Sequence, residues 1–267
     1  MEIDLPIVIN KCSHLIRLGN TCDGGYVVCM NDIKKSTKLI TLGLNDEWSF
    51  EKDFHNIAKN FNEAYDHSIN RKIFIFRVVK KFLKMILFRE SFFTFLEYVN
   101  RIREYGKYFD SNKGKHFQKK IVKKAKFRNE IGLDEVFSSN VNHCNFLKVD
   151  IEGSEYDIIS DITKNSKIIT GLIIEFHNIN INYHKFLKSL LELNREFNLI
   201  HVHANNYAPI LLNQKIPDVL ELSFSKKGNH QIVCSFLKSP VEGLDYPNNP
   251  NRNEIFFKTK AIDTSRF

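Results

Sequence analysis

Short apolar runs bounded by turn-forming residues open the chain, and a longer amphipathic segment follows them. Residues 16–18 and 26–30 are apolar and flank the polar, glycine-containing segment 20–25, which predicts a hairpin near the N-terminus. Residues 38–43 form an apolar run that ends on glycine, as expected of a buried strand. Apolar side chains then recur at helical spacing over residues 46–61, where Asp46 or Ser49 is expected to cap a helix.

Strands and helices alternate again after residue 117. Apolar runs predict strands at 145–150, 168–176, 199–203 and 219–224, and helical periodicity predicts helices at 154–162 and 183–197. This order predicts an α/β fold in which a mainly parallel, Rossmann-like sheet carries helices on both faces. At 267 residues the chain is long enough to bury a full core, and we expect residues 1–267 to form a single domain.

Residues 71–115 interrupt the alternation. Phe, Ile and Leu are frequent there, but Lys and Arg separate them, so no stretch reaches the roughly 18 apolar residues of a membrane span. Two amphipathic helices, inserted into the domain, are the expected structure. In the simplest interpretation their apolar faces pack on the core, and the alternatives are a lid over the acceptor site or peripheral contact with an anionic membrane surface.

Charge is concentrated in the same part of the chain. The sequence is 43% hydrophobic and 26% charged, which excludes a disordered or low-complexity chain. Its net charge of +8 combines +14 between residues 71 and 128 with −6 elsewhere. This distribution indicates an enzyme-like body with one basic segment rather than a general nucleic-acid binder.

The five cysteines are widely spaced and include no C-x-x-C pair. This spacing predicts free thiols in a reducing compartment rather than a disulfide framework or a zinc site. The first residues also lack the basic flank and apolar run of a signal peptide. The chain is therefore expected to be cytoplasmic.

Polar residues at two predicted strand ends have the spacing of an adenosine site. In open parallel sheets, ligands bind beyond the carboxyl ends of the strands. The residues in question are Gly43, Leu44, Asn45, Asp66, His67 and Ser68. Asp66 follows Gly43 by 23 positions, where an acid can accept hydrogen bonds from both ribose hydroxyls. A single glycine, instead of the three of G-x-G-x-x-G, disfavours NAD and FAD and favours S-adenosylmethionine.

The densest polar cluster follows the strand at 145–150. Asp150 and Glu152 are two residues apart and so point to the same side of an extended strand. Glu155 falls on the first turn of the next predicted helix, where a carboxylate stabilises the helix N-terminus.

Three of these segments resemble one family. Residues 148–155 match the D-x-E-G-x-E signature of FkbM-type methyltransferases, residues 43–45 resemble the family's G-x-N turn, and residues 132–135 resemble the step before its signature strand. The resemblance covers residues 37–180 and implies a class I S-adenosylmethionine-dependent fold that usually O-methylates sugars or other secondary metabolites. The chain departs from the pattern at Thr41, where the family usually has an acid, and at Glu47, where it has a second glycine.

The resemblance also extends to the N-terminal hairpin, which in some members could close over the cofactor. It implies that the hairpin contributes Arg17, Asp23, Gly24, Gly25 and Tyr26 to the cofactor site, together with Asp150 and Glu152 from the signature.

Two later strand ends supply candidate catalytic residues. Glu175 and His177 share one face of the strand at 168–176, and His201 and His203 share one face of the next. With Asp150, we take Glu175, His177 and His203 as catalytic candidates. His177 or His203 would be the base, because histidine titrates near neutral pH. A divalent metal on Asp150, Glu175 and His203 is the alternative, although we prefer the metal-free arrangement.

The expected activity is S-adenosylmethionine-dependent O-methylation of a hydroxyl group on a carbohydrate or sugar-nucleotide precursor. The first alternative is a non-catalytic nucleotide- or glycan-binding module with the same fold. The second is an RNA-modifying methyltransferase that uses the basic segment as its electrostatic footprint, although nucleic acid is not the expected partner.

Overall fold

A computed structural model describes residues 2–5, 9–89, 91–208, 210–211, 216–228, 233–234 and 236–261. Its centre is a nine-stranded sheet with the order β16-β2-β12-β15-β11-β10-β5-β6-β7. The strands are β2 (Ile9–Asn10), β5 (Lys38–Leu42), β6 (Phe61–Tyr65), β7 (Gly114–Phe117), β10 (Asn145–Val149), β11 (Ile169–Phe176), β12 (Phe197–Ala204), β15 (Leu220–Lys226) and β16 (Val233–Cys234).

The sheet is mainly parallel, as predicted. β7, β6, β5, β10 and β11 pair in parallel, whereas β15 runs antiparallel between β11 and β12. Every residue of β5 and β10 is buried, because both faces of the sheet are covered.

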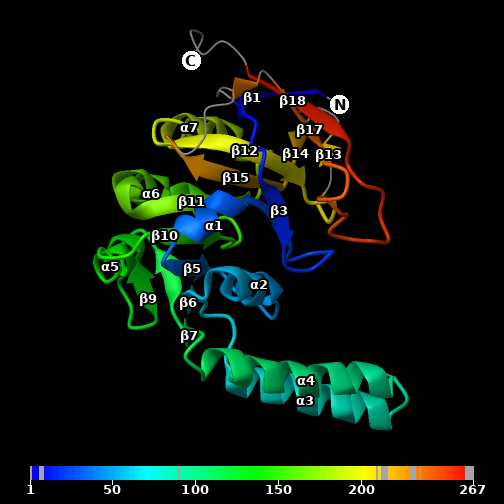
Figure 1. Ribbon diagram of the computed structural model, residues 1–267. Helices are drawn as coiled ribbons and strands as arrows, with labels where there is room; N and C mark the ends of the chain where they lie inside the picture. The colour runs from blue at the N-terminus through cyan, green and yellow to red at the C-terminus, as the bar shows by residue number, and fades with distance from the viewer. Residues whose placement is uncertain are drawn as a thin grey trace.

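Helices cover both faces of the sheet (Figure 1). On one face, α5 (Leu133–Ser138), α6 (Ile159–Lys164) and α7 (Tyr183–Leu193) pack against side chains such as Leu147 and Leu172. On the other face, α1 (Met30–Lys35) and α2 (Ser49–Ala58) pack against Phe146 and Ile173, which are adjacent in sequence to Leu147 and Leu172. This alternation along the strands confirms the two-faced arrangement.

The predicted hairpin is present and covers the second face. It consists of β3 (Leu15–Leu18) and β4 (Tyr26–Cys29), and Leu18, Tyr26 and Val28 join the core formed by α1 and α2. Four cysteines of the described residues, Cys12, Cys22, Cys29 and Cys144, form no disulfide.

The basic insertion forms an antiparallel pair of helices, α3 (Arg71–Ile86) and α4 (Phe92–Phe109). We call this pair the helical hairpin. It lies below the sheet and extends away from it (Figure 1). Only its base is buried, where Phe74, Tyr105 and Phe109 surround Trp48. The prediction that the apolar faces of these helices pack on the core therefore holds only for the base of the helical hairpin. No helix in the described ranges combines the length and apolar character that a membrane crossing requires.

Three predicted helix boundaries are wrong. α2 ends at Ala58, because Lys59 adopts a left-handed conformation (φ 56°) and Phe61 begins β6. The helix expected at 154–162 is instead a 3-10 turn, Glu155–Asp157, followed by α6. The helix expected to reach residue 197 ends at Leu193, and Phe197 begins β12.

Smaller sheets flank the main one. β1 (Glu2–Leu5), β18 (Phe257–Ala261) and β17 (Phe236–Ser239) form a three-stranded sheet, and two pairs consist of β8 (Lys120–Val122) with β9 (Glu130–Gly132) and of β13 (Ile210–Leu211) with β14 (Ile216–Pro217).

Candidate active site

The carboxyl ends of β5 and β10 lie against each other and form the floor of the site. Asp150 donates its backbone N–H to the carbonyl of Leu42 at 2.8 Å. Gly43 has φ +81°, and a Cβ there would overlap the carbonyl oxygen of Asp150. Only glycine therefore allows the two turns to approach this closely.

A cavity of about 380 Å³ opens at these strand ends. It contains most of the residues predicted to bind the cofactor. They are Gly43, Asn45, Asp66, His67, Ser68, Asp150 and Glu152. Leu44 is an exception, because its side chain is buried among the aromatic residues at the base of the helical hairpin.

Asp66 holds two walls of this cavity together. Its Oδ2 accepts the backbone N–H groups of Leu44 (2.9 Å) and Asn45 (2.7 Å), and its Oδ1 accepts both the N–H and the hydroxyl of Ser68 (2.6 Å each). Burial alone would raise the pKa of Asp66, but these hydrogen bonds outweigh it and lower the pKa. The carboxylate borders the cavity as predicted, while its hydrogen bonds here come from the chain itself.

Glu155 closes the loop that follows β10, a role that the sequence analysis missed. It is fully buried, and its Oε1 accepts the backbone N–H groups of Ile151 (3.3 Å) and Gly153 (2.9 Å). Glu152 and Gly153 have positive φ values, 55° and 102°, which turn the chain back over this carboxylate. Glu155 therefore organises the signature loop rather than the N-terminus of a long helix.

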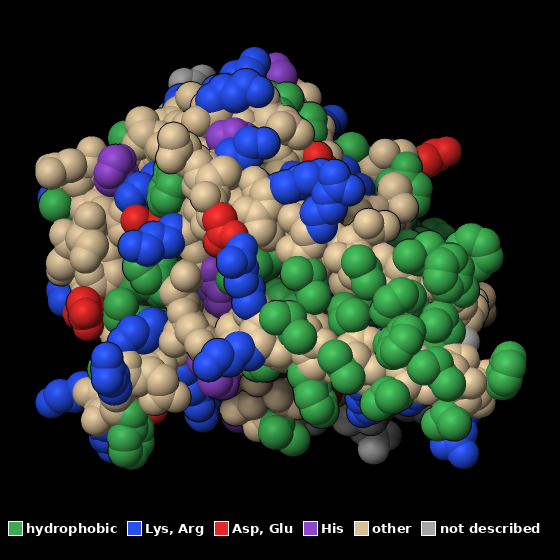
Figure 2. Space-filling model, turned by 90° about the horizontal axis from the view of Figure 1, so that it is seen from below, with side chains coloured by type: hydrophobic (Ala, Val, Ile, Leu, Met, Phe, Trp, Pro, Cys, Tyr) green, Lys and Arg blue, Asp and Glu red, His purple; other side chains and the backbone are tan. Residues whose placement is uncertain are grey.

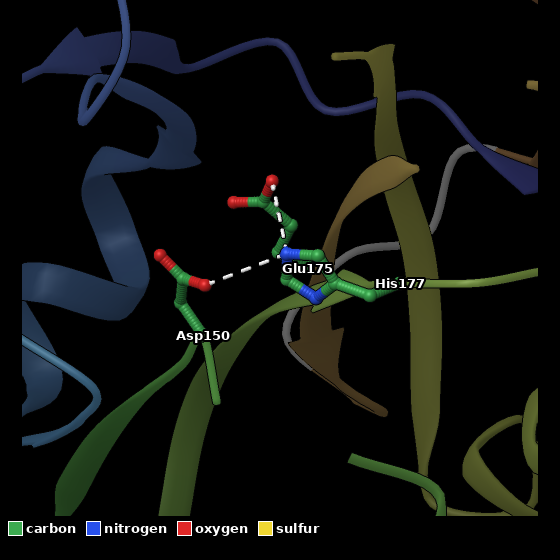
Figure 3. A group of neighbouring side chains, drawn as sticks. All are labelled: Asp150, Glu175 and His177. Carbon is green, nitrogen blue, oxygen red and sulfur yellow. Dashed lines mark ion pairs between the residues drawn. The ribbon is translucent and has the colours of Figure 1, made fainter. Parts of the chain in front are cut away.

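Three predicted catalytic residues come together above this loop. Asp150, Glu175 and His177 point toward one another, and their nearest ligand atoms all lie within 4.8 Å (Figure 3). Nε2 of His177 lies 3.8 Å from Oδ1 of Asp150 and 3.6 Å from Oε1 of Glu175. Its Nδ1 lies 3.0 Å from Oε1 of Glu155.

The acidic groups around His177 raise the pKa of its imidazole, so the ring holds its proton strongly. Burial alone would lower the pKa of its imidazole. The hydrogen bond to Glu155 and the charges of Glu175, Glu155 and Asp150 outweigh burial and raise the pKa to about 10. His177 is therefore an imidazolium ion at neutral pH.

Burial has the opposite effect on the two carboxylic acids. It raises the pKa of Asp150 to about 6 despite the nearby charges of Lys148 and His177, and raises that of Glu175 well above its usual range. The hydroxyl of Tyr26 lies 3.3 Å from Oδ2 of Asp150 and 3.3 Å from Oε2 of Glu175. Asn205 donates its amide to the other oxygen of Glu175 at 2.9 Å.

A second cavity of about 310 Å³ borders this cluster on the other side. It shares Asn45, Asp150 and Glu152 with the first cavity. Its remaining lining is polar and acidic for the most part, namely Asp23, Glu175, His177, Asn205, Tyr207, Ala208 and Val219. Asp150 thus stands where the two cavities meet.

Four of the five residues predicted from the hairpin line neither cavity. The guanidinium of Arg17 donates to the carbonyls of Asn20, Cys22 and Leu244 and so fixes the hairpin turn. Gly24 packs against Glu47, and Gly25 lies against Arg17. Of the five hairpin residues, only Asp23 borders a cavity, while Tyr26 contacts the catalytic cluster from below.

His203 does not join the cluster, so the predicted metal set is corrected. Its Nδ1 lies 3.0 Å from Oε2 of Glu221 and its Nε2 lies 3.4 Å from Oε1 of Glu254. β15 separates β12 from β11, which displaces His203 by two strands. Among the described residues, the group that could hold a metal ion is Asp150, Glu175 and His177.

Comparison with known families agrees with this geometry. The family model named "Methyltransferase FkbM domain" matches residues 20–199. The chain belongs to this family. As a member, it is an S-adenosylmethionine-dependent methyltransferase with a class I fold. A comparison with curated proteins found no match.

Several solved structures show remote similarity. A precorrin-6y C5,15-methyltransferase from Geobacter metallireducens is 10% identical, with 74% of this chain and 86% of that chain covered and a TM-score of 0.37. A fibrillarin pre-rRNA processing protein from Methanococcus jannaschii is 12% identical, with 74% of this chain and 69% of that chain covered and a TM-score of 0.34. A putative caffeoyl-CoA O-methyltransferase from Staphylococcus aureus is 12% identical, with 72% of this chain and 78% of that chain covered and a TM-score of 0.33.

The structure accounts for both departures from the FkbM pattern. Thr41 donates its hydroxyl to Oε1 of Glu51 at 3.0 Å, and Nζ of Lys148 lies 3.1 Å from the same oxygen. Helix α2 thus places the buried carboxylate of Glu51 beside Thr41. Glu47 accepts the N–H of Ser49, the first residue of α2, at 2.7 Å. The N-cap position is Trp48, so neither Asp46 nor Ser49 caps the helix as predicted.

Proposed function

We propose that this methyltransferase methylates a hydroxyl group of a neutral carbohydrate, free or as the sugar part of a sugar-nucleotide. The observation that carries the proposal is the position of Asp150 between two cavities. The larger cavity would hold S-adenosylmethionine against Gly43, Asn45 and Asp66. When bound, this cofactor supplies a methyl group on a sulfonium ion.

The larger cavity fits a nucleoside-sized molecule. Its volume of about 380 Å³ lies within the range of small-molecule sites. Gly43 leaves the cavity floor without a side chain, and His67 and Ser68 add polar groups at the end of β6. These features support cofactor binding at the strand ends.

The smaller cavity is suited to a hydroxyl-rich acceptor. The carboxyl oxygens of Asp23 and Glu175 can accept hydrogen bonds from sugar hydroxyl groups, and Asn205 offers an amide. The ring of Tyr207 is 52% exposed and available to pack on a sugar. Because the described residues of this lining include several acids and neither Lys nor Arg, they disfavour phosphate groups, and therefore RNA, at this position.

Asp150 is better placed than a histidine to remove the acceptor proton. His177 is already protonated, and its Nδ1 is bound to Glu155. Asp150 borders both cavities and becomes a carboxylate above a pKa of about 6, which suits a general base near neutral pH. In this proposal His177 orients Asp150 and compensates the negative charge around it.

Substitution of Asp150 tests the assignment. With labelled S-adenosylmethionine and a panel of sugars, sugar-nucleotides and RNA, we expect Asp150→Asn to lower kcat by about 10²-fold or more. The affinity for S-adenosylhomocysteine should stay within a few-fold, and Asp134→Asn, an exposed change, should leave turnover intact. Turnover retained by Asp150→Asn would reject Asp150 as the base. Cofactor binding without turnover of any acceptor would favour a binding module, and turnover of RNA alone would reject the carbohydrate.

Whether the methyl transfer requires a divalent metal ion can be tested separately. We propose a metal-free mechanism, because the charge of His177 already faces the carboxylates that would otherwise require a cation. Activity should therefore be unchanged after treatment with EDTA. Loss of activity in EDTA and its recovery with Mg²⁺ or Mn²⁺ would contradict this mechanism. The cytoplasm remains the compartment we propose for the enzyme.

A further inference from the structure

The helical hairpin exposes an apolar stripe on each of its helices. On α3 the stripe consists of Ile75, Val79, Phe82 and Ile86, at helical spacing, and each is more than a third exposed. On α4 it consists of Phe92, Leu96 and Val99. Phe88 and Phe93, 98% and 77% exposed, stand where the two helices join.

Both stripes lie on the same side of the hairpin. The helices contact each other mainly through other positions, such as Phe74 with Tyr105 and Lys81 with Tyr98, and at the edge of the stripe Phe82 packs on Phe95 with ring centroids 5.5 Å apart. On each helix the stripe is rotated from this contact by about 130° in the same sense, at 100° per residue. Because the helices are antiparallel, equal rotations bring both stripes to one side. Figure 2 shows this side as a continuous hydrophobic area that faces away from the sheet.

Basic side chains accompany this apolar face. Residues 71–110 contain ten Lys and Arg against four acidic residues. Lys72, Arg89 and Arg103 are exposed, and none of them forms an ion pair within the described part of the chain. Lys80 is also exposed but lies about 130° from the stripe of α3, at 100° per residue. Both Lys72 and Arg103 continue the two stripes toward the base of the hairpin.

We propose that this face of the helical hairpin docks on a bilayer that contains anionic lipids. The apolar stripes and the phenylalanines at the tip enter the boundary between headgroups and acyl chains, and the basic residues contact lipid phosphates. A second copy of the chain is a poorer occupant, because two such faces would oppose like charges. The inference goes beyond the proposed function and does not depend on the acceptor.

Vesicle flotation tests the docking. We expect the protein to float with vesicles of phosphatidylcholine and phosphatidylglycerol at 7:3, to float at least ten-fold less with phosphatidylcholine alone, and to lose binding as salt rises. Phe88→Asp/Phe93→Asp should weaken binding at least ten-fold. Phe127→Asp/Ile181→Asp, which changes two exposed apolar residues outside the hairpin, should bind as the unchanged protein does.

Two further measurements keep the test decisive. Thermal unfolding and S-adenosylhomocysteine affinity should be the same for both double variants, and Lys72→Glu/Arg103→Glu provides an independent loss of binding without a change in apolar surface. Equal vesicle binding by all variants, or no binding by the unchanged protein, would overturn the proposal. So would a dimer in sedimentation that Phe88→Asp/Phe93→Asp dissociates, if vesicles were not bound.

Discussion

Glu155 shows at the scale of one residue how the site is held. One oxygen of its carboxylate accepts two backbone N–H groups of the signature loop and also contacts Nδ1 of His177. The loop and the imidazole are therefore oriented by the same buried charge. This arrangement explains why His177 remains protonated although it is largely buried.

Replacing Glu155 by glutamine should lower the pKa of His177. The amide oxygen can still accept the backbone N–H groups, but the charge is lost, and a charged hydrogen bond is worth about 1.5–3 kcal/mol, or about 1–2 pKa units. An NMR titration of His177 measures the shift from about 10. The matched change Glu135→Gln, at an exposed position, should leave the titration unaltered, and an unshifted His177 in Glu155→Gln would refute the role of Glu155.

The same substitution has a defined effect on stability. Because the folded-state pKa of His177 is raised, its proton contributes stability that is fully present below about pH 6.5 and lost as pH rises through about 10. Urea unfolding should therefore show the variant less stable near pH 7, with the part of the difference that depends on this proton vanishing above pH 10. A difference independent of pH would contradict this linkage.

Gly43 can be tested against a matched glycine. Gly243 also has a positive φ, 76°, but a Cβ added there would meet no atom within 4 Å, so Gly243→Ala should cost only the left-handed backbone, about 1–2 kcal/mol. Gly43→Ala also forces overlap with the turn of Asp150, for a total of about 2–5 kcal/mol. Chemical denaturation measures both. Equal losses would show that the two strand-end turns can separate without cost.

At this scale, part of the site could be predicted from the sequence. Strand alternation places Glu175 and His177 on one face, and the rule that ligands bind at strand ends brings Asp150 to them. Glu155 could not be predicted, because its role depends on positive φ values at Glu152 and Gly153. His203 was misplaced for another reason: local sequence does not show that the later strand β15 lies between β11 and β12.

Among elements, α2 and β10 are joined by a buried ion pair. Lys148 and Glu51 are 3.1 Å apart with their side chains 4% and 0% exposed. Burial lowers the pKa of Lys148, but Glu51 and Asp150 outweigh this effect and raise it, so the amine stays charged. The pair fixes α2, the helix that follows the Gly43–Asn45 turn, to the strand that leads into Asp150.

Lys148→Met should therefore destabilise the protein by about 3–5 kcal/mol, because the charge of Glu51 is left buried without its partner. In the double variant Lys148→Met/Glu51→Leu most of this loss should be recovered. Urea unfolding of the single and double variants measures the difference. If the double variant is no more stable than Lys148→Met, the uncompensated charge is not the cause.

Periodicity predicted the elements better than their ends. Helical spacing continues past Ala58 to Phe61, although Lys59 turns the chain and Phe61 enters a strand. The apolar residues after each end belong to the next strand, and a pattern of apolar positions does not separate the two when the connection is short.

In the whole molecule, the helical hairpin is connected to the larger cavity. Asp46 directly follows Asn45, and its Oδ2 lies 3.1 Å from Nη1 of Arg77 and 2.5 Å from Nη1 of Arg101, one from each helix. Arg77 also lines the larger cavity. The sequence predicted two amphipathic helices but not their direction, because these long-range ion pairs and the aromatic cluster around Trp48 set it.

Asp46→Asn should loosen this connection. Each partly exposed pair contributes about 0.2–1 kcal/mol, so affinity for S-adenosylhomocysteine should fall by less than ten-fold while amide exchange in α3 and α4 increases. Calorimetry and hydrogen–deuterium exchange measure the two effects. Asp134→Asn, which removes an exposed ion pair with Lys164 far from the hairpin in sequence, is the control. Unchanged exchange in both helices would show that Asp46 does not restrain them.

Because Asp46 binds α3 near its base, a small rotation there produces a large displacement at the outer end of the helix. Sixteen residues of helix measure about 24 Å, so a few degrees of rotation at the base moves the tip by more than an ångström. A force applied at the phenylalanine tip would act on Asn45 through the ion pairs of Asp46 with Arg77 and Arg101. By reciprocity, a molecule that stiffens the Asn45 turn also restricts the swing of the arm, so the occupancy of one end can be sensed at the other.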